Sequence, residues 1–211
     1  MMIFRNFILA LLIFSLAEAK SRDKTTEFFF VPQYSASQTL KFENGTKAEI
    51  DEGFGFGFGF GYNFNPNFEV GILFSYTEAD YTAYYKDKNG ENIHSRHNLY
   101  TSGINLLGTY NILKGDITPF VSVNGGWTYT NTGIDNGEDY IACDPFYYYG
   151  FCGVYSGSHT DNSFNYGASI GMRFDFRKWF LKGSYGINVI DYDSTNDAKF
   201  DIFQITVGSS F

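Results

Sequence analysis

The sequence predicts an all-β protein, an eight-stranded antiparallel up-and-down β-barrel that spans a membrane. Three observations predict this fold. An apolar N-terminal segment ends in a cleavage motif, so we expect the chain to be exported. Most of the remainder alternates apolar with small or polar residues, which is the period of a β-strand and not that of a helix. Short and long polar connections follow each other in turn, as in membrane-embedded barrels.

The composition excludes several other classes of protein. The chain has 211 residues, enough for one domain or two small ones, and 20% of them are aromatic. Disordered chains are poor in aromatic residues, so this content excludes disorder. A net charge of −8 leaves no basic patch for non-specific binding of nucleic acid. The sequence also lacks the sustained heptads of a coiled coil.

Residues 1–19 have the three parts of a secretory signal peptide. Arg5 supplies the positive charge, residues 7–16 are apolar, and Ala17-Glu18-Ala19 fits the A-x-A cleavage site. Cleavage after Ala19 leaves residues 20–211, which we expect to form one barrel domain. An N-terminal membrane anchor is the alternative, but an apolar run of about ten residues is too short to span about 30 Å as a helix.

The first two predicted strands are 27–38 and 53–62. The facing of the first is ambiguous because residues 28–31 are all apolar, and Pro32 must lie at a bulge or an unpaired position. The second alternates glycine with an aromatic residue, so one face of the strand is aromatic and the other is glycine. A glycine-rich phosphate loop is excluded, because G-x-G-x-x-G spacing requires a glycine where Phe58 stands.

Six further segments alternate in the same way. Their apolar positions form one row that would face lipid, and their small or polar positions form the other row. These strands are expected at 68–77, 103–110, 121–129, 164–174, 179–189 and 203–211. Each of the eight strands should be about ten to thirteen residues long, which suits a tilted membrane strand.

The connections alternate in length. Short turns are expected at 65–67, 113–116 and 176–178, and four longer polar loops at about 39–51, 80–98, 131–161 and 192–199. An even number of strands places both termini on the periplasmic side and the four longer loops outside. A soluble barrel or sandwich is the alternative, but the interior of a small barrel is too narrow for so many aromatic side chains.

The third long loop contains the only cysteines, Cys143 and Cys152. An exported chain passes an oxidising compartment, so we expect them to form a disulfide. A metal site would need more ligands than two thiols, and only His159 is near. The rings between the cysteines would form a stapled tip that binds a surface partner; alternatively they fold over the barrel mouth or lie among lipid head groups. They are Phe146, Tyr147, Tyr148, Tyr149 and Phe151.

Four charged residues are expected in the lumen. Alternation places their side chains on the inner face, and their proximity to short turns places them at the periplasmic end. A charge in a narrow lumen must be paired or hydrated. We therefore expect an ion cluster that fills the lumen and no wide pore. The residues are Glu69, Arg173, Asp175 and Lys182.

Catalysis is not expected. An enzyme that modifies lipids would need a nucleophile, a base and an orienting acid near the membrane surface. His94, His97 and His159 fall in predicted loops, and the position of Ser95 beside His94 does not by itself make such a site. The sequence therefore predicts no enzyme, no metal site and no cofactor.

The signal peptide, the Gly-Phe repeat that continues through residues 62–71 and the terminal Phe211 resemble a known family. This is the family of small eight-stranded outer-membrane barrels of Gram-negative bacteria, the porin-like OmpA-barrel, OmpX and OmpW type. The resemblance covers the whole mature chain and implies a location in the outer membrane. The long third loop with its two cysteines departs from the family pattern.

The resemblance implies partners as well as a fold. It implies contact with outer-membrane lipids and lipopolysaccharide, and recognition of Phe211 by the barrel-assembly machinery. The expected role is structural or one of surface interaction, in which the four extracellular loops meet a ligand or host partner. A narrow porin-like channel for small or hydrophobic solutes is the alternative, and a lipid-modifying enzyme is a remote third.

Overall fold

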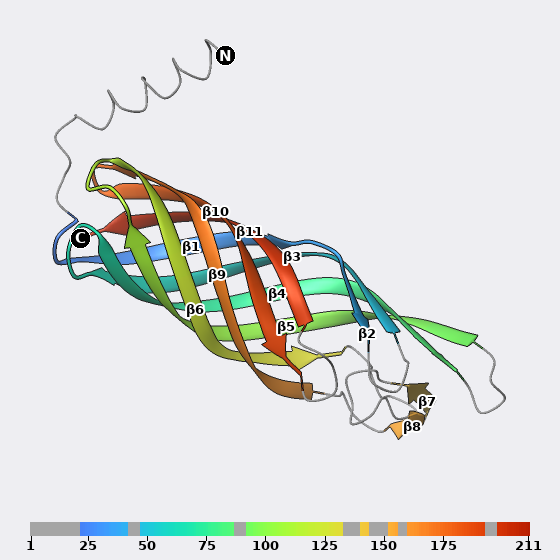
Figure 1. The fold of residues 1–211 in the computed structure, drawn as a ribbon. Helices are drawn as coiled ribbons and strands as arrows, with labels where there is room; N and C mark the ends of the chain where they lie inside the picture. The colour runs from blue at the N-terminus through green and yellow to red at the C-terminus, as the bar shows by residue number, and fades with distance from the viewer. Residues whose placement is uncertain are drawn as a thin grey trace, which may run out of the picture.

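A computed structural model describes residues 22–41, 47–86, 92–132, 140–143, 152–155, 160–192 and 198–211. Figure 1 shows these residues arranged as a barrel of strands. Within this part of the chain, no helix is long and apolar enough to cross a membrane. The predicted signal peptide, residues 1–19, lies outside the described residues.

The strands are β1 (Thr25–Ser35), β2 (Gln38–Lys41), β3 (Lys47–Asn63), β4 (Phe68–Lys86), β5 (Asn92–Asn111), β6 (Ile117–Asn131), β7 (Tyr140–Cys143), β8 (Cys152–Tyr155), β9 (Thr160–Phe176), β10 (Trp179–Asp191) and β11 (Ala198–Ser210).

The sheet closes on itself through β1. This strand pairs antiparallel with β3 on one side and with β11 on the other. β2 resumes its path after Ala36 and Ser37 and also pairs with β3, so β1 and β2 count as one barrel strand. With β3, β4, β5, β6, β9, β10 and β11 the barrel has eight strands, all antiparallel. The predicted fold class is confirmed, and β7 and β8 add a separate ribbon in the third long connection.

The predicted alternation is confirmed along the barrel wall. Phe54, Trp127 and Ile170 on the outer face are 69%, 68% and 64% exposed. The glycine face of β3 lies inside, where it makes room for the ring of Phe29. A Cβ added to Gly59 would lie 2.5 Å from that ring. The ambiguous first strand therefore turns Phe29, with Glu27 and Val31, inward and turns Phe28 and Phe30 outward.

Pro32 is unpaired toward β11, as predicted, and is opposite Phe56 of β3 on its other side. The register of β1 with β11 pairs Phe30 with Val207 and Gln33 with Gln204, and it leaves Val31 and Pro32 without partners on that side. The register is the same before and after the gap, so the strand contains no bulge there. The gap includes the one residue of the strand that has no N–H to donate.

The prediction of loops at 39–51 and 80–98 is wrong for most of their residues. β3 begins at Lys47, β4 ends at Lys86 and β5 begins at Asn92, so His94 and His97 lie in a strand. β3, β4, β5, β6 and β9 have 17, 19, 20, 15 and 17 residues, more than the expected ten to thirteen. Figure 1 shows β4 and β5 extending past the ends of β6 and β10. We call this part of β3, β4 and β5, residues 47–52, 78–86 and 92–100, the strand extension.

A bulge explains why alternation did not reveal the extension. In the pairing of β3 with β4, Ile50 is opposite Tyr81 but Gly53 is opposite Ala79, so β3 carries one extra residue. The bulge reverses the alternation, and Ile50 faces inward like the odd-numbered glycines below it. Above this level the outward residues are polar, so strand pairing continues where the apolar pattern has ended.

Both ends of the described chain lie beside the short turns. Thr26 and Phe211 exchange two backbone hydrogen bonds, each 3.0 Å long, next to the turns at 64–67, 112–116 and 177–178. Figure 1 shows the C-terminus at the end of the barrel where β1 begins. The strand extension and the β7–β8 ribbon project from the opposite end. The two ends of the barrel therefore differ. At one end the short turns and the two chain ends lie together, and at the other end the strands extend further.

Candidate functional site in the barrel lumen

Arg173 is the centre of a charged layer at the short-turn end of the lumen. Its side chain projects inward from β9 and is fully buried, with 0% exposure. The guanidinium Nη2 lies 2.5 Å from Glu27 Oε1 of β1, and Nη1 lies 3.1 Å from Glu69 Oε2 of β4. Nε and Nη2 also donate to Asp175 Oδ1, at 3.0 and 2.9 Å. One arginine thus joins three carboxylates from three strands.

Lys182 of β10 adds a second cation to this layer. Its Nζ lies 2.6 and 2.8 Å from the two carboxylate oxygens of Glu69. The ring of Phe180 contacts both cations, with its centroid 4.4 Å from the Arg173 guanidinium carbon and 5.2 Å from Lys182 Nζ. Such cation–π contacts stabilise desolvated cations. Aromatic packing and ion pairing therefore fill the same cross-section of the barrel.

Arg22 closes the layer from below. It precedes β1, and its side chain is only 5% exposed. Nε and Nη2 donate to the carbonyl of Pro66 at 3.2 and 3.1 Å, Nη2 to that of Leu113 at 3.0 Å, and Nη1 to that of Gly115 at 3.3 Å. Nη1 also pairs with the carboxylate of Asp175. One side chain thus ties two of the short turns to the end of β9.

We call Arg22, Glu27, Glu69, Arg173, Asp175 and Lys182 the ion cluster. Three of these residues are cations and three are carboxylates, so their formal charges cancel. The structure brings together the four residues that the sequence predicted for the lumen. It adds Glu27 and Arg22, which sequence reasoning missed.

The two residues were missed for different reasons. Glu27 was missed because the facing of its strand was ambiguous, although a carboxylate inside a lipid-spanning strand must face the lumen. That rule fixes Glu27 and with it the whole first strand. Arg22 lies before the first strand, where alternation gives no information about side-chain direction.

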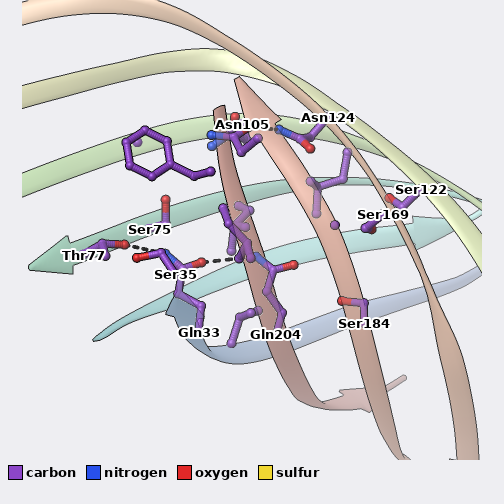
Figure 2. Close-up of a pocket in the computed structure, with 18 of the residues that line it drawn as sticks. Gln33, Ser35, Ser75, Thr77, Asn105, Ser122, Asn124, Ser169, Ser184 and Gln204 are labelled. Atoms are coloured by element: carbon purple, nitrogen blue, oxygen red, sulfur yellow. Dashed lines mark hydrogen bonds between the residues drawn. The ribbon is translucent and has the colours of Figure 1, made fainter. Parts of the chain in front are cut away.

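A chamber of about 160 Å³ lies above the ion cluster. Hydroxyl and amide side chains make up much of its wall, and Figure 2 labels ten of these residues. Gln204 Nε2 donates to Gln33 Oε1 at 3.1 Å, and Gln33 Nε2 donates to Thr77 Oγ1 at 2.6 Å. Among the described residues that line the chamber, only Glu69 and Lys182 are charged. Apolar side chains such as Phe29, Leu73 and Phe120 line it as well, so the middle of the lumen is a mixed surface of polar and apolar groups.

An apolar layer fills the lumen above the chamber. Its buried side chains come from both sides of the barrel: Leu40, Ala48, Ile50, Ala79, Tyr81, Ala83, Leu99, Ile190, Tyr192, Ala198 and Phe200. Tyr81 of β4 reaches across to the carbonyl of Thr132 at 3.1 Å, and the Tyr192 hydroxyl lies 3.1 Å from that of Thr130. We call this the upper layer. Buried side chains thus fill the described lumen on both sides of the chamber.

The outer face of the strand extension is polar and paired. Glu49 accepts hydrogen bonds from the Lys47 ammonium and, at 3.0 Å, from the Tyr84 hydroxyl, and these two donors lower the pKa of its carboxyl. Arg96 Nη2 lies 2.7 Å from Asp80 Oδ2 on the neighbouring strand.

Within the described residues, no group of three or more His, Cys, Asp or Glu side chains is placed to hold a metal ion.

Most of the predicted third-loop site falls outside the described residues. This applies to Phe146, Tyr147, Tyr148, Tyr149 and Phe151, and also to His159. The two cysteines are placed by their backbone: β7 and β8 are antiparallel, and Cys143 is opposite Cys152. Directly opposed residues of antiparallel strands have Cα atoms about 4.5–5.5 Å apart, within the range of disulfides.

The disulfide prediction is tested by non-reducing peptide mapping. We expect protein purified from native membranes to yield one peptide pair linked through Cys143 and Cys152, because the opposed backbones need no movement to be bridged. Closing so short a loop is expected to contribute about 2–3 kcal/mol to stability. Free thiols at both positions would contradict the prediction.

Three comparisons with known proteins bear on this architecture. A family model described as the outer membrane protein beta-barrel domain matches residues 7–211. No curated protein matches the chain. OprG of Pseudomonas aeruginosa is 14% identical, with a TM-score of 0.54 over 90% of this chain and 96% of that chain. Neisserial surface protein A is 15% identical, with a TM-score of 0.49 over 87% of this chain and 97% of that chain. The likeness to OprG concerns the fold.

Proposed function

The chain belongs to the family of outer-membrane β-barrel proteins of Gram-negative bacteria, and we propose that it serves as a closed barrel that presents a surface outside the cell. One observation carries the proposal. The ion cluster and the upper layer fill the lumen with buried side chains on both sides of the chamber. A lumen filled in this way does not provide a continuous water path. The surfaces outside the membrane are therefore the parts of the barrel that carry its function.

The strand extension is the part of the described chain best suited to meet a partner. Tyr76 is the last residue of the apolar outward row on β4, and the outward positions beyond it carry Glu78, Asp80, Thr82 and Tyr84. Ten residues separate Tyr76 from the end of β4, so at about 3.3 Å per residue the strand continues for roughly 30 Å. We propose that this surface and the loops meet a surface ligand or host partner.

The orientation follows from the same proposal. The short-turn end, with both chain ends tied together, faces the periplasm, and the strand extension faces outward among the head groups of lipopolysaccharide. The exposed aromatic rows of β1, β3 and β4 contact outer-membrane lipid. We propose that the assembly machinery recognises Phe211, which is 73% exposed and lies beside Thr26 at the short-turn end.

A non-enzymatic role is part of the proposal. His94 and Ser95 are consecutive in β5, so their side chains point to opposite faces and do not form a nucleophile–base pair. The buried carboxylates of the ion cluster are engaged with cations.

A narrow channel is the second candidate, and the chamber is the observation that favours it. The hydroxyl and amide groups in its wall are those of a short section of an aqueous path. For this path to conduct, both the ion cluster and the upper layer would have to rearrange, because each blocks it independently.

Planar-bilayer recording separates the two functions. We expect the wild-type protein, shown to be folded by heat-modifiable mobility in gels, to produce no stable conductance steps. A large-pore porin in the same bilayers is the positive control. A stable conductance that scales with the number of inserted molecules would overturn the closed barrel and favour the channel.

A further inference from the structure

Two lysines lie directly opposite each other on the outer face of β2 and β3. Lys41 is opposite Lys47, and both side chains point away from the lumen, because their neighbours Leu40 and Ala48 are buried on the inner face. Like charges in directly opposed positions of a sheet repel each other. Lys47 is paired with Glu49, whereas Lys41 is exposed and has no ion-pair partner among the described residues. These three side chains together therefore carry one uncompensated positive charge.

Two rings continue the same row on the next strands. Lys47 is opposite Tyr84 of β4, and Tyr84 is opposite His94 of β5. The ring centroids of Tyr84 and His94 are 6.3 Å apart, and Lys47 Nζ lies 5.6 Å from the Tyr84 centroid. Tyr84 is 40% exposed, and its hydroxyl donates to Glu49 at 3.0 Å, which fixes the ring. The row therefore joins an aromatic surface to a pair of cations.

This combination of side chains suits a sugar that carries an acidic group. We call Lys41, Lys47, Tyr84 and His94 the tip row. Aromatic rings offer a large apolar contact to the C–H face of a sugar ring, and ammonium groups form charge-assisted hydrogen bonds with a carboxylate. At about 4.8 Å between neighbouring strands, the tip row spans roughly 14 Å, which is wide enough for more than one sugar ring.

We propose that the tip row binds an acidic saccharide carried by a partner outside the cell. This inference rests on the proposed surface function and names the chemical class of its ligand. Tyr84 is eight residues beyond Tyr76, the last residue of the apolar outward row of β4, which is about 26 Å along the strand. The apolar part of the outer leaflet ends near Tyr76, so a saccharide that arrives from outside reaches the tip row before it reaches the lipid.

The charges between the tip row and the membrane restrict the ligand to one acidic group. Asp51 and Asp80 share Arg96, and Glu78 occupies the next outward position of β4 toward the membrane. Asp80 is four residues from Tyr84, about 13 Å along the strand, which exceeds the Debye length of about 8 Å at physiological ionic strength. A single carboxylate at the lysines is therefore screened from these acidic side chains. A longer polyanion would reach them and be repelled.

Binding of a trisaccharide tests the proposal. The mature chain in phospholipid nanodiscs is titrated with 3′-sialyllactose, which carries one carboxylate, and bound sugar is detected by saturation-transfer NMR. We expect saturable binding of sialyllactose, weaker binding of a heparin hexasaccharide, and no saturable binding of lactose, which lacks the acidic group. Nanodiscs that also contain lipopolysaccharide should bind sialyllactose with the same affinity.

Four results would overturn the proposal. They are no saturable binding of sialyllactose, equal binding of lactose, tighter binding of heparin, and loss of sialyllactose binding when lipopolysaccharide is present. The last result would mean that sugars of the cell's own outer leaflet occupy the tip row.

Matched variants assign the binding to the tip row. Lys41→Gln should weaken sialyllactose binding roughly tenfold, the effect of losing one charge-assisted hydrogen bond. Tyr84→Leu should have a similar effect, whereas Tyr84→Phe keeps the ring and should keep most of the affinity. Lys114→Gln makes the same chemical change at an exposed position of the short-turn end and is the control. Wild-type affinity in the folded Lys41→Gln and Tyr84→Leu proteins would contradict the site.

The saccharide titration and the bilayer recording fail independently of each other. If sialyllactose does not bind and the bilayers show no conductance, the saccharide site is refuted and the closed barrel stands. If the bilayers show a stable conductance, the closed barrel is refuted whatever the result of the titration.

Discussion

Replacing Arg173 by methionine is expected to lower the free energy of unfolding by about 3–5 kcal/mol, because the change leaves buried carboxylates without their shared cation. Glu27 would lose its only guanidinium partner among the described residues, whereas Glu69 keeps Lys182 and Asp175 keeps Arg22. The measurement is equilibrium unfolding by urea in detergent micelles or lipid vesicles.

A surface ion pair provides the control for the Arg173 substitution. Arg96→Met removes the pair with Asp80 on the strand extension, where the Arg96 side chain is 65% exposed, and should change stability by less than about 1 kcal/mol. Adding Glu27→Gln to Arg173→Met should recover part of the loss, since it removes the stranded charge. Equal effects of Arg173→Met and Arg96→Met would mean that the ion cluster is hydrated rather than buried.

Gly59→Ala is expected to destabilise the barrel by about 1–3 kcal/mol, the usual cost of forcing extra volume into a packed interior. The added Cβ would lie 2.3 Å from the carbonyl oxygen of Ile72 and 2.5 Å from the ring of Phe29. The backbone of β4 would have to move, because a carbonyl oxygen has no rotamer with which to retreat. Urea unfolding and the heat-modifiable mobility shift measure the effect.

Gly183→Ala is the matched control, because it makes the same chemical change in a strand of the same barrel. Nothing lies within 4 Å of a Cβ at Gly183, on the outer face of β10. We expect no loss of stability there, and a gain of up to about 1 kcal/mol from reduced freedom of the unfolded chain. Equal stability of the two alanine variants would mean that the glycine face of β3 is not needed for close packing between β1, β3 and β4.

The barrel was predictable because one physical rule acts at every position of the membrane-spanning strands. Each side chain of these strands faces either lipid or the narrow lumen. The apolar residues that face lipid, such as Phe54 and Ile170, can therefore be recognised directly in the sequence. The rule ends where lipid ends. In the strand extension the outward side chains are polar and the apolar ones face the upper layer, and the bulge before Gly53 reverses the alternation, so 39–51 and 80–98 were predicted as loops.

The candidate site was predictable only in part, for a related reason. Glu69, Arg173, Asp175 and Lys182 lie on well-phased strands, so alternation placed them on the inner face and their proximity to short turns placed them at one end. The position of Arg22 depends on where two turns meet the end of β9, and a local pattern contains no such information. The chamber depends on register: Gly126 faces Asn105, and Gly167 faces Asn124 and Asn188, only once the strands are aligned.

The central claim, a lumen sealed on both sides of the chamber, is tested most directly by the reactivity of a cysteine placed inside it. In a Cys143→Ser and Cys152→Ser background, Ser169→Cys adds a thiol to the chamber wall, and Arg96→Cys adds one to the exposed strand extension. The protein in lipid vesicles is treated with a small cationic methanethiosulfonate reagent, and modification is followed by mass. The account predicts rapid modification at position 96 and protection at position 169 until the barrel is unfolded. Similar rates at the two positions would contradict it.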